Sequence, residues 1–366
     1  MIDYLITLSM NLFSIRRWNT RPLIEVDSEA SNSGFSMHIA ILLAFLEEDA
    51  DYCKIIKRMI LKDLPKCILS DISLETKRFI KRESPDLWKK TFCSAVSELL
   101  LSVPEEWRNE FEESILNSKD ESVEGRIIEF ADTYSAYLEC EINNRIFPEY
   151  FDGTLKELEK EINSFNNLKS IDILKKDENL KKYLLQIRSL VHAIRWNQFN
   201  RNVQTSVAGH TFFVTFLAFI LLKISETHFE NEYDFENTLM KALFHDVAES
   251  ITGDIISPTK KRIPGFDSII SDVENKMVES TLLKDFDYPF RSEIKDYTLN
   301  PFAGKNGKIV RAADLLGSLF ECRIEMKIGN SHPGFPRAYD SIMRELKKMN
   351  IKEIDYFLKW GIGGVL

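Results

Sequence analysis

The sequence predicts an all-helical protein built from two tandem copies of one helical bundle. Glycine and proline are scarce, at 14 and 11 of 366 residues, which favours helices over strands joined by tight turns. Long apolar runs, such as Phe212 to Ile224, indicate buried helices. A set of short sequence motifs also recurs in the same order in the two halves of the chain.

Five segments of the first half are matched in the second half. Their offsets are 178, 172, 183, 183 and 182, so the two copies differ only by small insertions. Five matches in one register are rarely produced by chance. We therefore predict domains at residues 1–150 and 185–366, joined by a linking helix at 151–184 that is rich in Glu/Lys pairs. The matched segments are Arg17–Asn19 with Arg195–Asn197, Ser36–Phe45 with the segment from His210, Met59–Leu64 with Ala242–Val247, Leu69–Ser73 with Thr252–Ile256, and Gly125–Asp132 with Gly307–Asp314.

The second copy concentrates side chains that bind divalent metals. His245 and Asp246 are adjacent, His210 lies on an earlier predicted helix, and Asp314 lies on a later one. Adjacent helical residues point about 100° apart, so both reach one ion only where the ion sits against that helix. Imidazole nitrogens and carboxylate oxygens suit hard or borderline divalent ions. We therefore expect these four residues to hold one metal ion in a metal-dependent hydrolase.

The first copy lacks part of this set. Lys62 stands where the doublet histidine is expected, and Lys66 stands at the position of Glu249. A lysine ammonium has no lone pair to donate and repels a cation. We therefore expect a degenerate copy without metal, whose role is to pack on the second copy as an intramolecular pseudo-dimer; a basic pocket for a regulatory anion is the alternative. The ligand-type residues that we match to the second copy are His38, Asp63 and Asp132.

The segments around the doublet resemble the HD superfamily of metal-dependent phosphohydrolases, and most of all its YfbR-like 5′-deoxyribonucleotidase branch. The resemblance covers roughly residues 185–330 and includes the pair Arg195-Trp196 upstream of His210. One position departs from the family pattern, because Gly209 stands where a glutamate usually precedes the first histidine. The resemblance implies a helical bundle with a hydrolytic site that acts on nucleotides.

The resemblance also implies roles for four further residues. Glu249 is expected to act near the attacking water as a general acid or base. Arg195 is expected to contact the phosphate, because its guanidinium is a planar fork of donors. Trp196 is expected to form a flat wall against a sugar or base, and Asp254 to accept hydrogen bonds from a deoxyribose hydroxyl.

The ligand set limits the cofactor and the reaction. Two histidines and two carboxylates fill about four positions of an octahedral ion, so Co²⁺, Mn²⁺, Zn²⁺, Ni²⁺ and Mg²⁺ all fit. HD relatives with two or three metals have further histidines after the doublet, whereas none occurs from Val247 to Ala313. We therefore expect one metal and a phosphohydrolase of (deoxy)nucleoside 5′-monophosphates. The alternatives are a dNTP triphosphohydrolase and a non-catalytic nucleotide-sensing or interaction protein.

Composition narrows the class further. The net charge is −9 and no basic run is present, which argues against a nucleic-acid partner. The five cysteines form no CxxC pair, as expected of reduced thiols in the cytoplasm. The apolar segment Met1 to Phe13 is too short to span a bilayer, so we expect no membrane partner.

Overall fold

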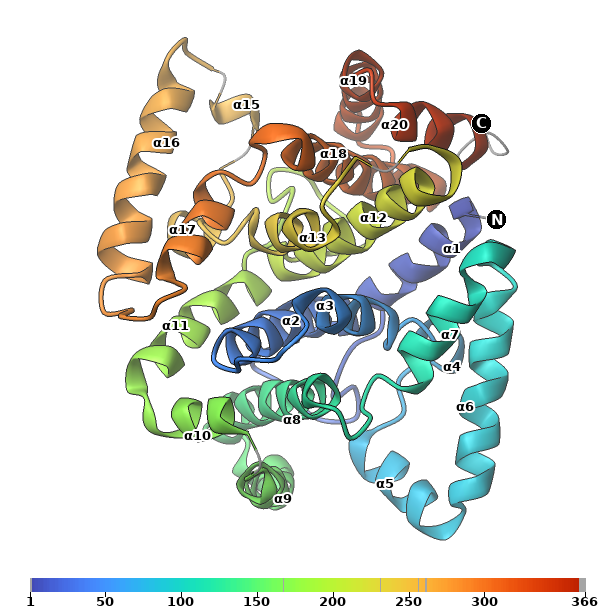
Figure 1. Ribbon diagram of the computed structural model, residues 1–366, viewed down its shortest axis with the longest axis vertical. Helices are drawn as coiled ribbons and strands as arrows, with labels where there is room; N and C mark the ends of the chain where they lie inside the picture. Colours follow the sequence, from blue (N-terminus) through green and yellow to red (C-terminus); the bar gives the residue numbers. More distant parts are fainter. Residues whose placement is uncertain (1, 167, 231, 256, 261, 362–366) are drawn as a thin grey trace. The chain divides into compact units, whose positions relative to one another are not determined.

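The chain folds into helices throughout the part that the structure describes. The structure is a computed structural model that describes all residues except 1, 167, 231, 256, 261 and 362–366 (Figure 1). Its described residues form no named strand, and two isolated β-bridges are the extended pairings among them. The predicted all-α class is therefore confirmed. The chain divides into two compact units: the first includes residues 2–172 and the last described residues, 360 and 361, and the second is Ile173–Lys359.

The first unit is a bundle around α2. This helix is buried from Glu29 to Ala44, because small and apolar side chains occupy every face. It packs against α3 and α8, and α9 packs on α8. The helices in chain order are α1 (Ile2–Ser9), η1 (Met10–Phe13), α2 (Glu29–Phe45), α3 (Tyr52–Leu61), α4 (Lys66–Leu69), α5 (Leu74–Glu83), α6 (Pro85–Leu100), η2 (Glu105–Trp107), α7 (Arg108–Leu116), α8 (Val123–Asn144) and α9 (Pro148–Ser164).

The second unit is organised around α12 in the same way. This helix is long and apolar enough to cross a membrane by length and composition, but its apolar window is entirely buried inside the protein, as in a core helix. It packs against α13 and α18, and α19 packs on α18. The helices after α10 (Lys169–Lys176) are α11 (Glu178–Arg188), η3 (Ser189–Val191), α12 (Val207–His228), α13 (Phe235–Phe244), α14 (Glu249–Thr252), α15 (Ser257–Lys260), α16 (Phe266–Met277), η4 (Val278–Leu282), α17 (Arg291–Leu299), α18 (Gly304–Lys327), α19 (Gly334–Lys348), α20 (Lys352–Tyr356) and η5 (Phe357–Gly361).

The start of each core helix shows that the two units repeat one local structure. Ser28 caps α2 by accepting a hydrogen bond from the third residue beyond it, and Ser206 caps α12 in the same way. Each serine also forms an isolated bridge to the residue twelve positions earlier. Trp18 and Trp196 both have a positive φ, 51° and 56°, which is rare outside glycine. All these pairs share the offset that relates Arg17 to Arg195.

These caps correct one of our matches between the copies. His210 lies four residues after Ser206, so its counterpart four residues after Ser28 is Asn32, and our match of His210 to His38 was wrong. The Asn32 side chain accepts a hydrogen bond from Ser135 at 2.8 Å, within the α2–α8 contact that corresponds to α12 on α18. The first copy therefore lacks both histidines of the predicted metal site.

Two further pairs of positions confirm the register of the remaining matches. Ser70 and Gly253, which the repeat places at equivalent positions, both have a positive φ at the end of the short helix α4 or α14. Gly125 and Gly307, a second equivalent pair, each lie so close to the preceding loop that an added Cβ would be 2.2 Å from a backbone atom of that loop. A glycine is required at both places for the same steric reason.

Residues 151–184, for which we predicted one linking helix, contain parts of three helices. Most of α9 lies there, followed by α10 and the part of α11 up to residue 184. Because α9 packs on α8 as α19 packs on α18, α9 repeats an element of the second unit. The limits of the two functional domains stay a prediction.

Candidate metal site

The His245-Asp246 doublet lies in a helical turn between α13 and α14. Asp234 caps the start of α13 through its side chain, and the helix ends at Phe244, directly before the doublet. His245 Nδ1 lies 2.8 Å from the Ala242 carbonyl oxygen. A carbonyl can only accept, so Nδ1 carries the proton and the lone pair of His245 is on Nε2. The ring is therefore in the tautomer that suits a metal ligand.

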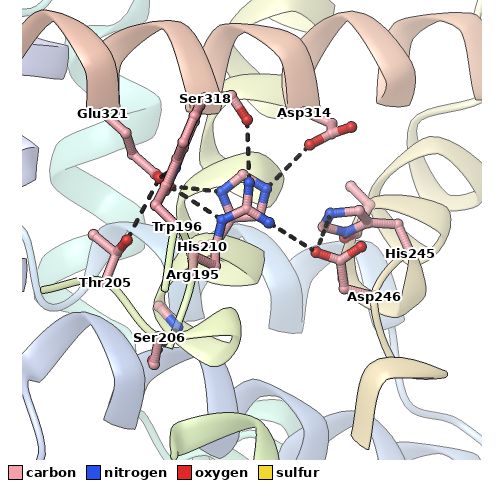
Figure 2. A network of polar contacts seen from close by, with 12 residues as sticks. Arg195, Trp196, Thr205, Ser206, His210, His245, Asp246, Asp314, Ser318 and Glu321 are labelled. Carbon is pink, nitrogen blue, oxygen red and sulfur yellow. Dashed lines mark hydrogen bonds and ion pairs between the residues drawn. The ribbon is translucent and has the colours of Figure 1, made fainter. Parts of the chain in front are cut away.

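Three of the four predicted ligands converge in the structure. One ligand-type atom each of His210, His245 and Asp246 lies within 4.8 Å of the others. His245 Nε2 is 3.1 Å from Asp246 Oδ2, and Figure 2 shows both beside the His210 ring. Both atoms are buried and make no hydrogen bond to any described residue. Buried polar atoms that lack hydrogen bonds are costly, and a bound cation would interact with both of these atoms.

Asp314, the fourth predicted ligand, reaches this group through His210. Its Oδ1 lies 3.1 Å from His210 Nε2, and its Oδ2 accepts a hydrogen bond from Arg311 at 2.8 Å. It is not one of the three residues in the converging group. Burial opposes ionisation of Asp314, but the hydrogen bond from His210 and the charge of Arg311 outweigh it and hold the pKa of this carboxyl far below its usual range. Asp314 is therefore a carboxylate on the edge of the site.

Glu321 is a functional residue that our sequence reasoning missed. Its fully buried carboxylate lies two helical turns beyond Asp314 on α18 and is 2.9 Å from His210 Nδ1. It also accepts a hydrogen bond from Trp196 Nε1 at 2.5 Å. This contact directs the other nitrogen of His210 toward the converging group, as outer carboxylates do behind metal-bound histidines. The sequence offered one signal, because Glu139 occupies the corresponding position of the first copy.

Arg195 lies between the converging group and Glu321. Its guanidinium is 3.6 Å from Asp246 Oδ2 on one side and 3.6 Å from Glu321 Oε1 on the other, and it donates to Ser318 Oγ at 3.1 Å (Figure 2). Burial alone disfavours the charge, but these carboxylates more than compensate and raise the pKa of Arg195. A permanent positive charge therefore stands within a few ångströms of the candidate metal ligands.

Trp196 and the two remaining acids have different settings. The Trp196 ring packs near Phe199 and Phe335, with centroids 6.0 Å away in each case. Glu249 begins α14, and its Oε2 is buried without a hydrogen-bond partner among the described residues. Burial, together with the charges of Asp246 and Asp254, raises the pKa of Glu249 well above its usual value. Burial and Asp246 also raise the pKa of Asp254, so both acids lie within electrostatic reach of the doublet.

The donor set of this site fits a divalent cation. The site contains two imidazoles and a carboxylate, and one nitrogen of each imidazole is held by an oxygen acceptor. These groups are typical ligands of a borderline divalent metal. The ligands come from the start of α12, the turn after α13 and the middle of α18. A helical bundle with a His-Asp doublet placed in this way defines the HD class of metal-dependent phosphohydrolases.

Comparisons with known proteins identify the branch of this class. The family described as 5′-deoxynucleotidase YfbR-like matches residues 4–177 and again residues 182–362. The chain belongs to this family, and it contains the family domain twice. This confirms the predicted resemblance and the tandem duplication.

Two curated relatives each match less than half of this chain and most of their own length, which agrees with a duplicated chain. A 5′-deoxynucleotidase of Vibrio atlanticus is 26% identical over 165 residues, which are 45% of this chain and 84% of that protein. A 5′-deoxynucleotidase of Yersinia pestis is 28% identical over 163 residues, 43% of this chain and 80% of that protein. The solved structure of an HD-domain phosphohydrolase from Listeria innocua, 24% identical, covers 50% of this chain and 86% of that chain with a TM-score of 0.45.

Proposed function

We propose that the second copy removes phosphate from (deoxy)nucleoside 5′-monophosphates with one divalent metal ion held by His210, His245, Asp246 and Asp314. The observation that carries the proposal is the convergence of the buried His210 and His245 with the half-buried Asp246 beside the guanidinium of Arg195. The relatives named 5′-deoxynucleotidases support the substrate class. The metal is one of Co²⁺, Mn²⁺, Zn²⁺, Ni²⁺ and Mg²⁺.

The metal and the side chains have separate tasks in this proposal. A divalent cation supplies Lewis-acid polarisation of a phosphoryl oxygen and lowers the pKa of a water molecule. Glu321 orients His210 through the 2.9 Å contact to Nδ1, so that Nε2 faces Asp314 and would bind the cation on giving up its proton. Arg195 binds the phosphate, because its charge is permanent and lies 3.6 Å from Asp246. The phosphate is thereby held beside the metal ligands.

Glu249 moves the proton in this proposal. The residue is half-buried and begins α14 three residues after Asp246, and its buried Oε2 has no hydrogen-bond partner among the described residues. It serves as the general acid or base of the hydrolysis. Asp254 follows Gly253, whose φ of 73° forms the turn after α14, and accepts a hydrogen bond from the deoxyribose hydroxyl. Trp196, fixed through its Nε1 to Glu321, provides an apolar wall for the sugar or base.

One experiment tests the reaction and the substrate class together. Release of inorganic phosphate is measured for deoxynucleoside mono- and triphosphates, with divalent metal and with excess chelator. We expect metal-dependent release of phosphate from the monophosphates. Release of tripolyphosphate from dNTPs would replace the proposal by a triphosphohydrolase. No turnover of any nucleotide by the metal-loaded protein would favour the nucleotide-sensing alternative.

The proposal also covers the role of the first copy and the compartment in which the protein works. We propose that the first copy binds no metal, since Lys62 replaces the doublet histidine and Asn32 stands at the position of His210. Its packing on the second copy as an intramolecular pseudo-dimer remains a proposal, which small-angle X-ray scattering of the whole chain can test. The five cysteines are free thiols, as expected for a cytoplasmic protein. The acidic net charge of −9 fits a small-molecule substrate better than a nucleic acid.

A further inference from the structure

The first unit contains a cavity at the position that corresponds to the metal site of the second. Its volume is about 450 Å³, within the range of small-molecule sites. It is lined by Asn32, Lys62, Asp63 and Asp132, which are the counterparts of His210, His245, Asp246 and Asp314. The degenerate copy has therefore lost metal ligands and kept a pocket.

Two lysine ammonium groups lie among the carboxylates of this cavity. Lys62 Nζ is 2.5 Å from Asp63 Oδ2 and 2.9 Å from Asp132 Oδ1, so it joins the counterparts of Asp246 and Asp314. Lys66 Nζ is 2.9 Å from Asp63 Oδ1 and 2.6 Å from Glu29 Oε2. Fixed ammonium charges therefore stand where the second copy has ligands for a mobile cation. A ligand in this cavity would meet fixed ammonium groups and no metal ion that could act as a Lewis acid.

Two lysines of α5 add positive charge to the lining of the cavity, and the Nζ of one of them, Lys77, lies 5.5 Å from the centre of the Trp88 ring. Lys77 and Lys81 lie one turn apart on α5, and neither forms an ion pair with a carboxylate of a described residue. Burial and the nearby charges of Lys66, Lys119 and Lys81 lower the pKa of Lys77 to about 8. The lining as a whole has seven basic and five acidic side chains, a net charge of +2 in a chain of −9. Such a cluster of cations favours a bound anion.

Aromatic side chains border the same cavity. Trp88 and Phe92 lie four residues apart on one face of α6. Trp18 is also part of the lining, and its Nε1 is buried without a hydrogen-bond partner among the described residues, whereas Nε1 of Trp196 in the second copy donates to Glu321. The base and the phosphate of one molecule would be complemented by an apolar ring surface, an indole donor and two ammonium groups that form no ion pair with a described carboxylate.

We propose that this cavity of the first copy is a second nucleotide site, which binds a nucleoside phosphate without hydrolysing it. Lys77 and Lys81 contact the phosphate, and Trp18, Trp88 and Phe92 surround the base. The site is built only from residues of the first unit. It therefore does not depend on the hydrolytic function proposed for the second.

The test uses the full chain with the second site silenced. In an Arg195→Ala chain with excess EDTA, equilibrium dialysis measures the binding of dAMP, deoxyadenosine and inorganic phosphate. We expect one dAMP per chain, bound at least about tenfold more tightly than either fragment, because each charge-assisted hydrogen bond contributes about that factor. Lys77→Glu with Lys81→Glu should weaken dAMP binding by about tenfold or more. The matched control is Lys89→Glu with Lys90→Glu, which makes the same charge change at exposed positions of α6 that do not line the cavity.

The outcomes separate this proposal from the hydrolytic one. Absence of dAMP binding, or equal dAMP binding by the Lys77/Lys81 and Lys89/Lys90 variants, would overturn the second site. Inorganic phosphate that binds as tightly as dAMP would reduce it to an anion site and overturn the nucleotide assignment. Metal-dependent phosphate release is measured separately on the same lysine variants with Arg195 intact, so its failure bears only on the second copy.

Discussion

Glu321→Gln is expected to weaken metal binding although Glu321 is not one of the proposed metal ligands. The carboxylate accepts from His210 Nδ1 at 2.9 Å and lies near Arg195 at 3.6 Å and Arg201 at 3.5 Å. The amide has nearly the same shape but no charge, so it no longer favours proton donation from Nδ1. The lone pair of His210 Nε2 becomes less basic and less firmly oriented.

The contacts of Glu321 determine the expected loss of metal affinity and the expected loss of unfolding free energy. Loss of a carboxylate behind a ligating histidine typically reduces metal affinity by about 10- to 100-fold, or about 1.4 to 2.7 kcal/mol. The same change leaves two buried guanidinium groups with less compensation. Breaking a buried ion pair costs about 3 to 5 kcal/mol, and the lower end applies because Arg201 keeps Glu325 and Arg195 keeps Asp246. We expect about 3 kcal/mol of unfolding free energy to be lost.

Glu139→Gln provides the matched control. Glu139 is also fully buried on α8 and accepts a hydrogen bond from Arg17 Nε at 2.9 Å, and Asn32 stands at the position that corresponds to His210. The Glu139→Gln substitution should lower the free energy of unfolding by an amount comparable to that of Glu321→Gln and leave metal affinity unchanged. Metal titration by calorimetry and urea denaturation measure the two quantities. Wild-type metal affinity in a folded Glu321→Gln protein would refute the role of Glu321.

Three other predictions concern four single substitutions. His245→Ala should abolish metal binding measured by elemental analysis, whereas Lys62→Ala should leave the metal content unchanged; two metals per wild-type chain would contradict this. Glu249→Gln should keep the metal but lower phosphate release by about 10² to 10⁴-fold, and parental turnover would move the proton transfer to Asp254. Lys77 has a folded pKa of about 8, below its ordinary 10.5, so its protonated form opposes folding below pH 8 and this cost fades as pH rises to 10.5. Lys77→Met should therefore raise the melting temperature at pH 7 but not at pH 10.5; an equal rise at both pH values would show that packing alone is responsible.

The sequence predicted the parts of the site that have a local signature. The His245-Asp246 doublet is recognisable from two adjacent residues, and the repeat was visible because Gly125 and Gly307 are sterically required at equivalent places. The match of His38 to His210 failed because α2 and α12 are apolar along most of their length, so a shift of six residues still aligns apolar side chains. The serine caps before these helices fix the register, since a cap has a defined position.

Contacts between distant helices could not be predicted in the same way. Glu321 is one glutamate within α18, and its contact with His210 joins positions 111 residues apart. Its only trace in the sequence is its recurrence as Glu139. The position of Arg195 between the carboxylates of Asp246 and Glu321 likewise joins segments that are far apart in the sequence. The contact of Glu321 with His210 follows from the packing of α12 on α18.

The most direct test of a single catalytic centre in the second copy compares two equivalent aspartates. Asp314→Asn and Asp132→Asn each replace a carboxylate by a neutral amide at corresponding positions of the two copies. The two aspartate side chains are similarly exposed, at 15% and 20%. Metal-dependent phosphate release from deoxynucleoside monophosphates should be nearly lost in Asp314→Asn and retained in folded Asp132→Asn. Loss in both folded variants, or full activity in Asp314→Asn, would contradict the assignment of hydrolysis to the second copy alone.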